Sequence, residues 1–366
     1  MLRTYIRFLL IISWTLALAG CLNTNSVSWS TSGSSDSTTI DSSNPHFVWL
    51  ENPGLQAAPL GDSPSLTIEA RDGNGLPMPA VPVNFTISTP LTARFTSTGN
   101  MTYSSTTDAA GQITFQIDTT GLGVIGITAT SPLLPPISTL GYCIPAGVRM
   151  WLNAGQNSLT LDPTGGVMFW SDVSGNSLDA SQATSTSRPL YVPSAINGLP
   201  GILFDGSDDN LDIPGTTGSD FSAGISAFIV AKTIVPSTTQ YLFDFTNSGS
   251  SRLALSIDYQ NSLAFEWDLS GQISPVNSYL PGGFLLYESV LSSGSIKLFK
   301  NGVQTAGPGV CAPTVTSRSI NKVGSTYAGS APMNGIISEI LIYNVSLSPT
   351  EQAAVEDYLR LRYNLW

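Results

Sequence analysis

The chain has 366 residues, and 42% of them are hydrophobic, which is enough for two domains that each bury a core. Charged residues make up only 11% of the chain and the net charge is -11, so there is no basic surface for the phosphates of nucleic acid or for an anionic membrane face. The single histidine, His46, excludes metal sites built from several histidines and argues against a histidine-based catalytic triad.

The first twenty residues have the pattern of an export signal. Two arginines accompany an apolar run from residue 8 to residue 18, and small residues follow. The run is shorter than the roughly 20 residues of a membrane span, which disfavours an uncleaved signal anchor. The sequence Leu-Ala-Gly-Cys ending at Cys21 resembles the bacterial lipobox, which implies that residues 1–20 are removed and that Cys21 carries the lipid. The resemblance also implies sorting to the outer membrane or cell surface, because Leu22 stands where an aspartate commonly retains such lipoproteins at the inner membrane.

Residues 21–45 consist mainly of Ser, Thr, Asn and Asp, without an apolar pattern. Such a segment cannot offset the entropy of ordering by burial, so we expect a flexible tether. After residue 45 the chain changes to short β-branched and apolar runs separated by turn residues, without helical periodicity until the last twenty residues. The sequence therefore predicts an all-β body.

Residues 46–140 have the pattern of one β-sandwich. Strands are predicted where apolar and polar residues alternate, at residues 65–70, 81–87, 113–117 and 125–130. Two turn motifs separate them, Asp-Gly-Asn-Gly-Leu-Pro-Met-Pro at residues 72–79 and Thr-Asp-Ala-Ala-Gly at residues 107–111. In this order the strands and motifs resemble the bacterial immunoglobulin-like domain of invasins and intimins. The resemblance implies an immunoglobulin-like β-sandwich that acts as a rigid spacer, with direct ligand binding as the alternative.

A second domain is predicted for residues 141–366, and the proline-rich residues 131–145 are expected to form an extended linker before it. Its motifs, in chain order, are Trp-Ser-Asp-Val-Ser-Gly-Asn at 170–176, Phe-Asp-Gly-Ser-Asp-Asp at 204–209, an Asn-Gly hairpin at 301–302, and a helix from Pro349 to about Tyr363 that begins with a capping box. Together they resemble the laminin-G-like members of the concanavalin A-like jelly rolls. The resemblance implies a two-sheet sandwich with a C-terminal helix and a face that many relatives use to hold glycans or protein loops.

Two cysteines remain once Cys21 is assigned to the lipid, namely Cys143 and Cys311. An even pair in an exported chain predicts a disulfide. Two separate buried thiols are the alternative, because a bridge requires Cα atoms within about 7 Å of each other.

The candidate ligand-binding residues of the second domain are Glu266, Trp267 and Asp268. An exposed Trp267 would offer a ring on which a sugar stacks, and the adjacent acids could accept hydrogen bonds from sugar hydroxyls. Adjacent strand residues point to opposite faces, so either Trp267 or the two acids face solvent. The alternative is that Trp267 belongs to the core, as most tryptophans of sandwiches do.

Glucanases of the same overall fold carry catalytic carboxylates on alternate residues of one strand, roughly 7 Å apart. Glu266 and Asp268 have this spacing, but Ser270 stands where a further acid is required. Only Glu288 or Glu339, arriving from elsewhere, could complete the set. We therefore assign no catalytic residues and expect no enzyme activity.

The densest acidic cluster of the second domain consists of Asp205, Asp208, Asp209 and Asp212. Calcium binds about six to eight oxygens, which the carboxylates and carbonyls of such a loop could supply, so calcium is the cofactor that the sequence suggests. The alternative is that these aspartates accept hydrogen bonds from the backbone of their own turns.

These features predict a lipid-anchored surface protein whose immunoglobulin-like spacer presents the laminin-G-like domain for adhesion. The expected partners are the membrane, through the lipid, and a glycan or an extracellular or surface protein, but not nucleic acid. Two alternatives stay open: a structural envelope protein without a specific ligand, and a polysaccharide hydrolase or lyase.

Overall fold

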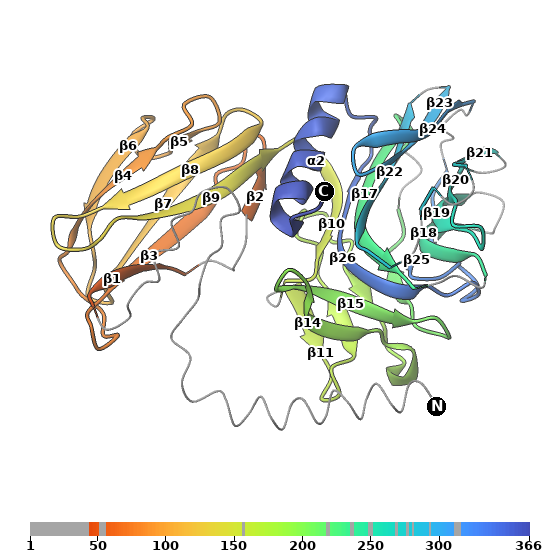
Figure 1. Ribbon diagram of the computed structural model, residues 1–366, viewed down its shortest axis with the longest axis horizontal. Coiled ribbons are helices and arrows are strands. Elements are labelled where there is room, and N and C mark those ends of the chain that lie inside the picture. Colours follow the sequence, from red (N-terminus) through yellow and green to blue (C-terminus); the bar gives the residue numbers. More distant parts are fainter. Residues whose placement is uncertain are drawn as a thin grey trace. The chain divides into compact units, whose positions relative to one another are not determined.

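The computed structural model describes residues 44–366 except for 51–55, 156–157, 217–219, 235–237, 248–251, 268–269, 276–277, 280–281, 293 and 311–315. Strands dominate this part of the chain, with one α-helix near the C-terminus (Figure 1), so the predicted all-β fold class is confirmed. The predicted signal peptide, Cys21 and nearly all of the predicted tether lie outside the described residues. Among the residues described, no helix has the length and apolar character to cross a membrane. The chain divides into two compact units, Met1–Cys143 and Ile144–Trp366.

The first unit is a sandwich of two antiparallel sheets. One sheet has the order β1-β3-β7-β5, formed by β1 (His46–Trp49), β3 (Ser65–Arg71), β7 (Gln112–Thr119) and β5 (Ala93–Phe95). The other has the order β2-β9-β8-β4-β6, formed by β2 (Gln56–Pro59), β9 (Ile137–Ile144), β8 (Gly123–Thr130), β4 (Pro82–Ile87) and β6 (Thr102–Thr106). Alternating apolar residues of both sheets form the core, in which the rings of Phe85 and Phe115 lie 4.6 Å apart.

The two turn motifs of the first unit have structural roles. Asp72 accepts hydrogen bonds from two backbone N–H groups of its own turn, at 2.8 and 2.9 Å, and Asp108 does the same in the second motif. Gly111 has a φ of +73°, and a Cβ at this position would lie 2.8 Å from the carbonyl oxygen of Ala70. Only glycine fits there without a shift of the backbone.

The stretch expected to be a linker contains a strand instead. β9 pairs antiparallel with β8, as part of the first unit. Its ladder is uninterrupted because the prolines of this stretch precede Ile137 or, as Pro145, follow the strand. Cys143 is buried in β9. Cys311 lies outside the described residues, so the disulfide stays a prediction.

The second unit is a larger two-sheet sandwich. Its eight-stranded sheet has the order β14-β15-β26-β17-β22-β23-β24, with β10 also paired to β26, and consists of β14 (Leu190–Ile196), β15 (Leu199–Asp205), β26 (Asn334–Tyr343), β17 (Ile225–Thr233), β22 (Leu285–Ser292), β23 (Ser295–Lys300), β24 (Val303–Gly309) and β10 (Val148–Asn153). Its nine-stranded sheet has the order β11-β12-β13-β16-β25-β18-β19-β20-β21, and consists of β11 (Leu159–Leu161), β12 (Val167–Trp170), β13 (Ala180–Ser181), β16 (Leu211–Ile213), β25 (Ile320–Val323), β18 (Gln240–Thr246), β19 (Arg252–Ile257), β20 (Leu263–Trp267) and β21 (Ser270–Ile273). A short 3-10 helix, η2 (Ser185–Ser187), precedes β14. The inner faces of the sheets share one core, which includes Ile229 and Phe243.

The predicted Asn-Gly hairpin is confirmed between β23 and β24, where Asn301 and Gly302 have φ values of 51° and 75°.

Helix α2 (Pro349–Tyr363) has the predicted bounds and the predicted capping box. Ser348 Oγ accepts a hydrogen bond from the Glu351 N–H at 3.4 Å, and the Glu351 side chain accepts one from the Ser348 N–H at 2.8 Å. Tyr358 of the helix packs edge-on against Trp151 of β10, with ring centroids 6.2 Å apart. The helix therefore covers the outer face of the eight-stranded sheet (Figure 1).

Candidate ligand-binding site

The outer face of the nine-stranded sheet is the face directed away from the core. Successive side chains of a strand point to opposite faces, so the core residues Phe243, Leu253 and Trp267 alternate with outward-facing ones. On β18, β19 and β20 the outward-facing residues include Asp244, Arg252 and Glu266. We call these three residues and Tyr241 the charged cluster.

Trp267 lies in the core. It is 1% exposed, and the guanidinium carbon of Arg318 lies 5.0 Å from its ring centroid. The strand register explains this burial. Trp267 pairs with Leu253, and both side chains point toward the opposite sheet. This corrects the expectation that Trp267 forms an exposed stacking platform. Asp268, the next candidate, lies outside the described residues.

Glu266 faces outward, as alternation with Trp267 requires. Its side chain is 35% exposed. Glu266 Oε1 accepts a hydrogen bond from Tyr241 Oη at 2.9 Å, and Oε2 accepts one from Arg252 Nη1 at 3.2 Å. These two contacts orient the carboxylate and leave part of it accessible to a ligand.

Arg252 is at the centre of the charged cluster. Its guanidinium donates two hydrogen bonds of 2.9 Å to the fully buried Asp244 and lies 4.3 Å from the ring centroid of Tyr241. Asp244 also accepts a hydrogen bond from the backbone N–H of Tyr327 at 2.8 Å. Burial acts to lower the pKa of Arg252, but the hydrogen bonds and charge of Asp244 outweigh it and raise the pKa. The cation is therefore held in place by paired anions.

Tyr241 provides the third fixed contact of the cluster. Burial, followed by the negative charge of Glu266, raises the pKa of Tyr241 to about 12. The phenol keeps its proton at neutral pH and donates a hydrogen bond to Glu266. Sequence reasoning missed Tyr241, Asp244 and Arg252 as site residues. The only local signal was a charged residue, Asp244, within the apolar run of β18.

The two glutamates that could complete a glucanase-type set lie on the other sheet. Glu288 of β22 and Glu339 of β26 are both fully buried. Glu339 accepts hydrogen bonds from Tyr358 and Tyr363 of helix α2, at 2.9 and 2.7 Å. Burial, followed by the charge of Glu356 on the same helix, raises the pKa of Glu288 well above its usual value. Both glutamates therefore face the helix and not the charged cluster.

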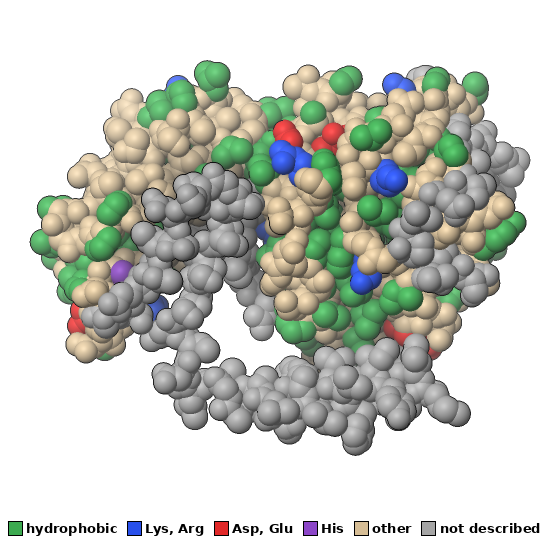
Figure 2. Space-filling view, in the orientation of Figure 1, with side chains coloured by type: hydrophobic (Ala, Val, Ile, Leu, Met, Phe, Trp, Pro, Cys, Tyr) green, Lys and Arg blue, Asp and Glu red, His purple; other side chains and the backbone are tan. Residues whose placement is uncertain are grey.

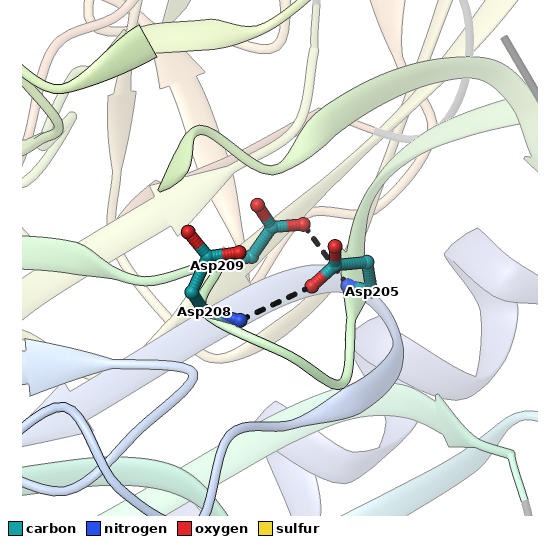
Figure 3. Close-up of side chains that lie close together, drawn as sticks. All are labelled: Asp205, Asp208 and Asp209. Carbon is teal, nitrogen blue, oxygen red and sulfur yellow. Dashed lines mark hydrogen bonds between the residues drawn. The ribbon is translucent and has the colours of Figure 1, made fainter. Parts of the chain in front are cut away.

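Three of the four predicted metal ligands come together in the turn after β15 (Figure 3). One carboxylate oxygen from each of Asp205, Asp208 and Asp209 lies within 4.8 Å of the others. Asp209 accepts a hydrogen bond from the Asp205 N–H at 3.0 Å, and Asp205 accepts one from the Asp208 N–H at 3.4 Å, so these carboxylates also hold the turn. Three carboxylates supply only part of the roughly six to eight oxygens that calcium binds. Calcium binding here stays a prediction.

Asp212 does not join this group, which corrects the four-residue metal set. It lies on β16 and forms an ion pair with Lys322 of the adjacent β25. Lys322 also donates a hydrogen bond to Asn210 at 2.9 Å. Strand pairing thus directs Asp212 to the outer face of the nine-stranded sheet.

On the surface shown in Figure 2, charged side chains form small separate groups among polar and hydrophobic ones.

Comparisons with known proteins find similarity in the second unit. Residues 205–351 match the laminin-G-like family model described as the concanavalin A-like lectin/glucanases superfamily. No curated protein matches the chain. Among solved structures, a Trypanosoma rangeli sialidase in complex with a 2,3-difluoro-nononic acid is similar at 18% identity and a TM-score of 0.44, over 60% of this chain and 33% of that one. Domain 4 of a Geobacillus stearothermophilus arabinanase, in complex with arabinotriose, is similar at 16% identity and a TM-score of 0.42, over 58% and 98%. A Ruminococcus gnavus sialidase carbohydrate-binding module bound to sialyllactose is similar at 18% identity and a TM-score of 0.34, over 43% and 96%. The chain spans about a third of the sialidase's length. The family match supports a concanavalin A-like lectin/glucanase domain at residues 205–351.

Proposed function

We propose that the second unit is a non-catalytic carbohydrate-binding domain whose ligand contacts the charged cluster on the nine-stranded sheet. The observation that carries this proposal is the Glu266 carboxylate, which is partly exposed while Tyr241 and Arg252 hold its orientation. A sugar hydroxyl binds well to an acceptor that is already oriented, because little side-chain entropy is lost on binding. The match of residues 205–351 to a lectin/glucanase superfamily model supports the same ligand class.

Hydrolysis is the second candidate, because Asp244 and Glu266 form a pair of carboxylates on one face. Both bind the same guanidinium, that of Arg252. Asp244 is fully buried, so it has no surface with which to reach a glycosidic bond or a water molecule. This arrangement favours binding over catalysis.

We further propose that lipid on Cys21 anchors the protein at the outer membrane or cell surface and that the first unit is an invasin-type spacer. The motifs of residues 18–21 and of the first unit support this arrangement. Mass spectrometry tests the anchor. The N-terminal residue of the mature protein should be a lipid-modified Cys21, and a Cys21→Ala variant should carry no lipid. An unmodified Cys21 in the membrane-extracted protein would contradict it. If this protein has no specific ligand, the alternative is that it is a structural component of the cell envelope.

The experiment that tests binding probes the full-length protein against an array of plant, bacterial and animal glycans. Glu266→Gln should weaken the binding of any glycan found by roughly tenfold or more, because a hydrogen bond to a charged group is lost. Asp357→Asn, which removes an exposed carboxylate from helix α2, is the matched control and should bind as the parent does. Absence of binding to every glycan would refute the proposal, and release of reducing ends would favour hydrolysis.

A further inference from the structure

Two carboxyl groups meet where helix α2 lies on the eight-stranded sheet. Glu288 of β22 points to the outer face of this sheet, because its neighbour Tyr287 points into the core. The helix covers this face, and the Glu288 side chain is fully buried. Its carboxyl group is hydrogen-bonded to that of Glu356, a half-buried residue near the middle of the helix. We call Glu288 and Glu356 the carboxyl pair.

The hydrogen bonds around the carboxyl pair leave one buried oxygen for a proton. Glu288 Oε1 accepts a hydrogen bond from the Gly302 N–H of the β23–β24 hairpin at 2.8 Å. Glu356 Oε1 accepts one from Gln352 Nε2 at 2.7 Å. Glu288 Oε2 is buried and, among the described residues, no N–H or O–H group donates a well-formed hydrogen bond to it. A protonated Glu288 removes this deficit, because its O–H donates to Glu356.

The strands beside Glu288 offer no opposite charge to the carboxyl pair. The register neighbours of Glu288 are Phe228 of β17 and Phe299 of β23. Lys297, two residues before Phe299 on the same face, is exposed. Tyr279 stays neutral, because burial raises the pKa of its phenol and the charge of Glu288 raises it further. Among the residues described on these strands, none is a buried cation.

The charges of the remaining neighbours are already balanced. Glu339 of β26 lies 3.3 Å from the guanidinium of Arg362. On helix α2, Glu351 binds the N-cap, and the exposed Asp357 and Arg360 pair with each other at 2.9 Å. Two adjacent carboxyl groups without a cation cannot both ionise without strong repulsion. The carboxyl pair therefore shares one proton.

The shared proton links this contact to pH. Burial, followed by the charge of Glu356, holds the pKa of Glu288 well above its usual value. In the unfolded chain neither effect acts, so Glu288 ionises there at its ordinary, lower pKa. Between these two values the folded state binds one more proton than the unfolded state. The contact is therefore fully stable below the lower value and weakens as pH rises toward the upper one.

Ionisation would act on one half of helix α2. The second half is held by Glu339, which accepts hydrogen bonds from Tyr358 and Tyr363. The first half contacts the β23–β24 hairpin, where a Cβ at Gly302 would lie 3.0 Å from Glu356 Oε2. Two adjacent negative charges would repel each other at this point. The first half of the helix would then loosen while the second half stays attached.

We propose that the carboxyl pair is a pH-sensitive contact, which holds the first half of helix α2 on the sheet while it carries a proton and loosens it when the proton leaves. The step is a deprotonation: the O–H bond of Glu288 breaks, the proton passes to solvent, and both carboxylates are then charged. The helix is therefore held most tightly in mildly acidic surroundings. This regulation does not depend on whether the second unit binds a carbohydrate.

Hydrogen–deuterium exchange of the full-length protein tests this proposal between about pH 5 and pH 9, above the usual pKa of a glutamate. Protection of the backbone amides of residues 352–357, corrected for the intrinsic effect of pH on exchange, should fall by up to about tenfold per pH unit, because one proton is released. Glu288→Gln keeps an acceptor for Gly302 and a donor for Glu356 but cannot ionise, so its protection should not change with pH. Asp357→Asn, which removes an exposed carboxylate from the same helix, is the matched control and should behave as the parent does.

Glu356→Gln keeps the proposal testable if Glu288→Gln does not fold. It removes the neighbouring anion but not the burial, so its protection should fall less than that of the parent. Helix protection that is constant with pH in the parent would overturn the proposal. An equal fall in Glu356→Gln and the parent, or any such fall in Glu288→Gln, would do the same. An equal fall in β17 would also overturn it, since the whole unit and not the helix would then be opening.

Discussion

Replacing Arg252 by methionine tests whether the charged cluster is held together as described. Methionine keeps much of the hydrocarbon stem but removes the guanidinium and with it the two 2.9 Å hydrogen bonds to Asp244. Asp244 is fully buried and would lose its cationic partner. Removing one member of a buried ion pair costs about 3–5 kcal/mol, so we expect the unfolding free energy of the second unit to fall by that amount.

Denaturant unfolding of the full-length protein, followed by tryptophan fluorescence, measures the effect. Arg360→Met is the matched control, because Arg360 pairs with Asp357 at an exposed position of helix α2 and its loss should cost less than about 1 kcal/mol. The double variant Arg252→Met, Asp244→Leu should regain most of the lost stability, because it leaves no buried charge without a partner. The reasoning is refuted if Arg252→Met is as stable as Arg360→Met, or if the double variant is no more stable than Arg252→Met.

Four further predictions concern stability. Glu339→Gln leaves the buried guanidinium of Arg362 without its carboxylate 3.3 Å away, so unfolding free energy should fall by about 3–5 kcal/mol; a loss below about 1 kcal/mol in denaturant titrations would contradict the burial argument. Trp267→Ala should cost about 3–5 kcal/mol as a core truncation, and ligand affinity of the molecules that stay folded should not change; selective loss of binding would restore Trp267 to the site. The folded protein holds the Tyr241 proton between pH 10 and about 12 while the unfolded chain releases it, so stability should fall as pH rises through this range. Tyr241→Phe should lessen that slope, and identical slopes would count against the raised pKa. Calcium should raise the melting temperature if Asp205, Asp208 and Asp209 bind it, and Asp208→Asn should abolish the rise; unchanged melting in calcium and in chelator would exclude the site.

Local chemistry was enough to predict the parts of the fold that depend on neighbouring residues. Helix α2 begins where predicted, because the capping box of Ser348 and Glu351 and the proline at position 349 all act within the first turn. The Asn301-Gly302 hairpin formed because these two residues tolerate positive φ. Alternation of apolar and polar residues predicted the all-β class, because the two-residue period of a strand is also a property of neighbouring residues. The prediction failed at β9, where the prolines implied a linker although a pairing partner, β8, was available to the residues between them.

The site depended on residues that only tertiary structure brings together. Alternation showed that Glu266 and Trp267 face opposite ways, but not which of them faces the core. Pairing of β20 with β19 decided this, because it placed Trp267 beside Leu253 on the inner face. Tyr241, 25 residues before Glu266, reaches it only across the sheet.

The strand order of the nine-stranded sheet shows the same limit over longer distances. Phe169 and Glu266 belong to strands far apart in sequence, and Lys322 enters between them from β25 near the end of the chain. Sequence patterns record the two-residue period of each strand, which fixes the face of a side chain relative to its neighbours. They do not record the order and register of the strands, because these are set by the packing of the two sheets into one core.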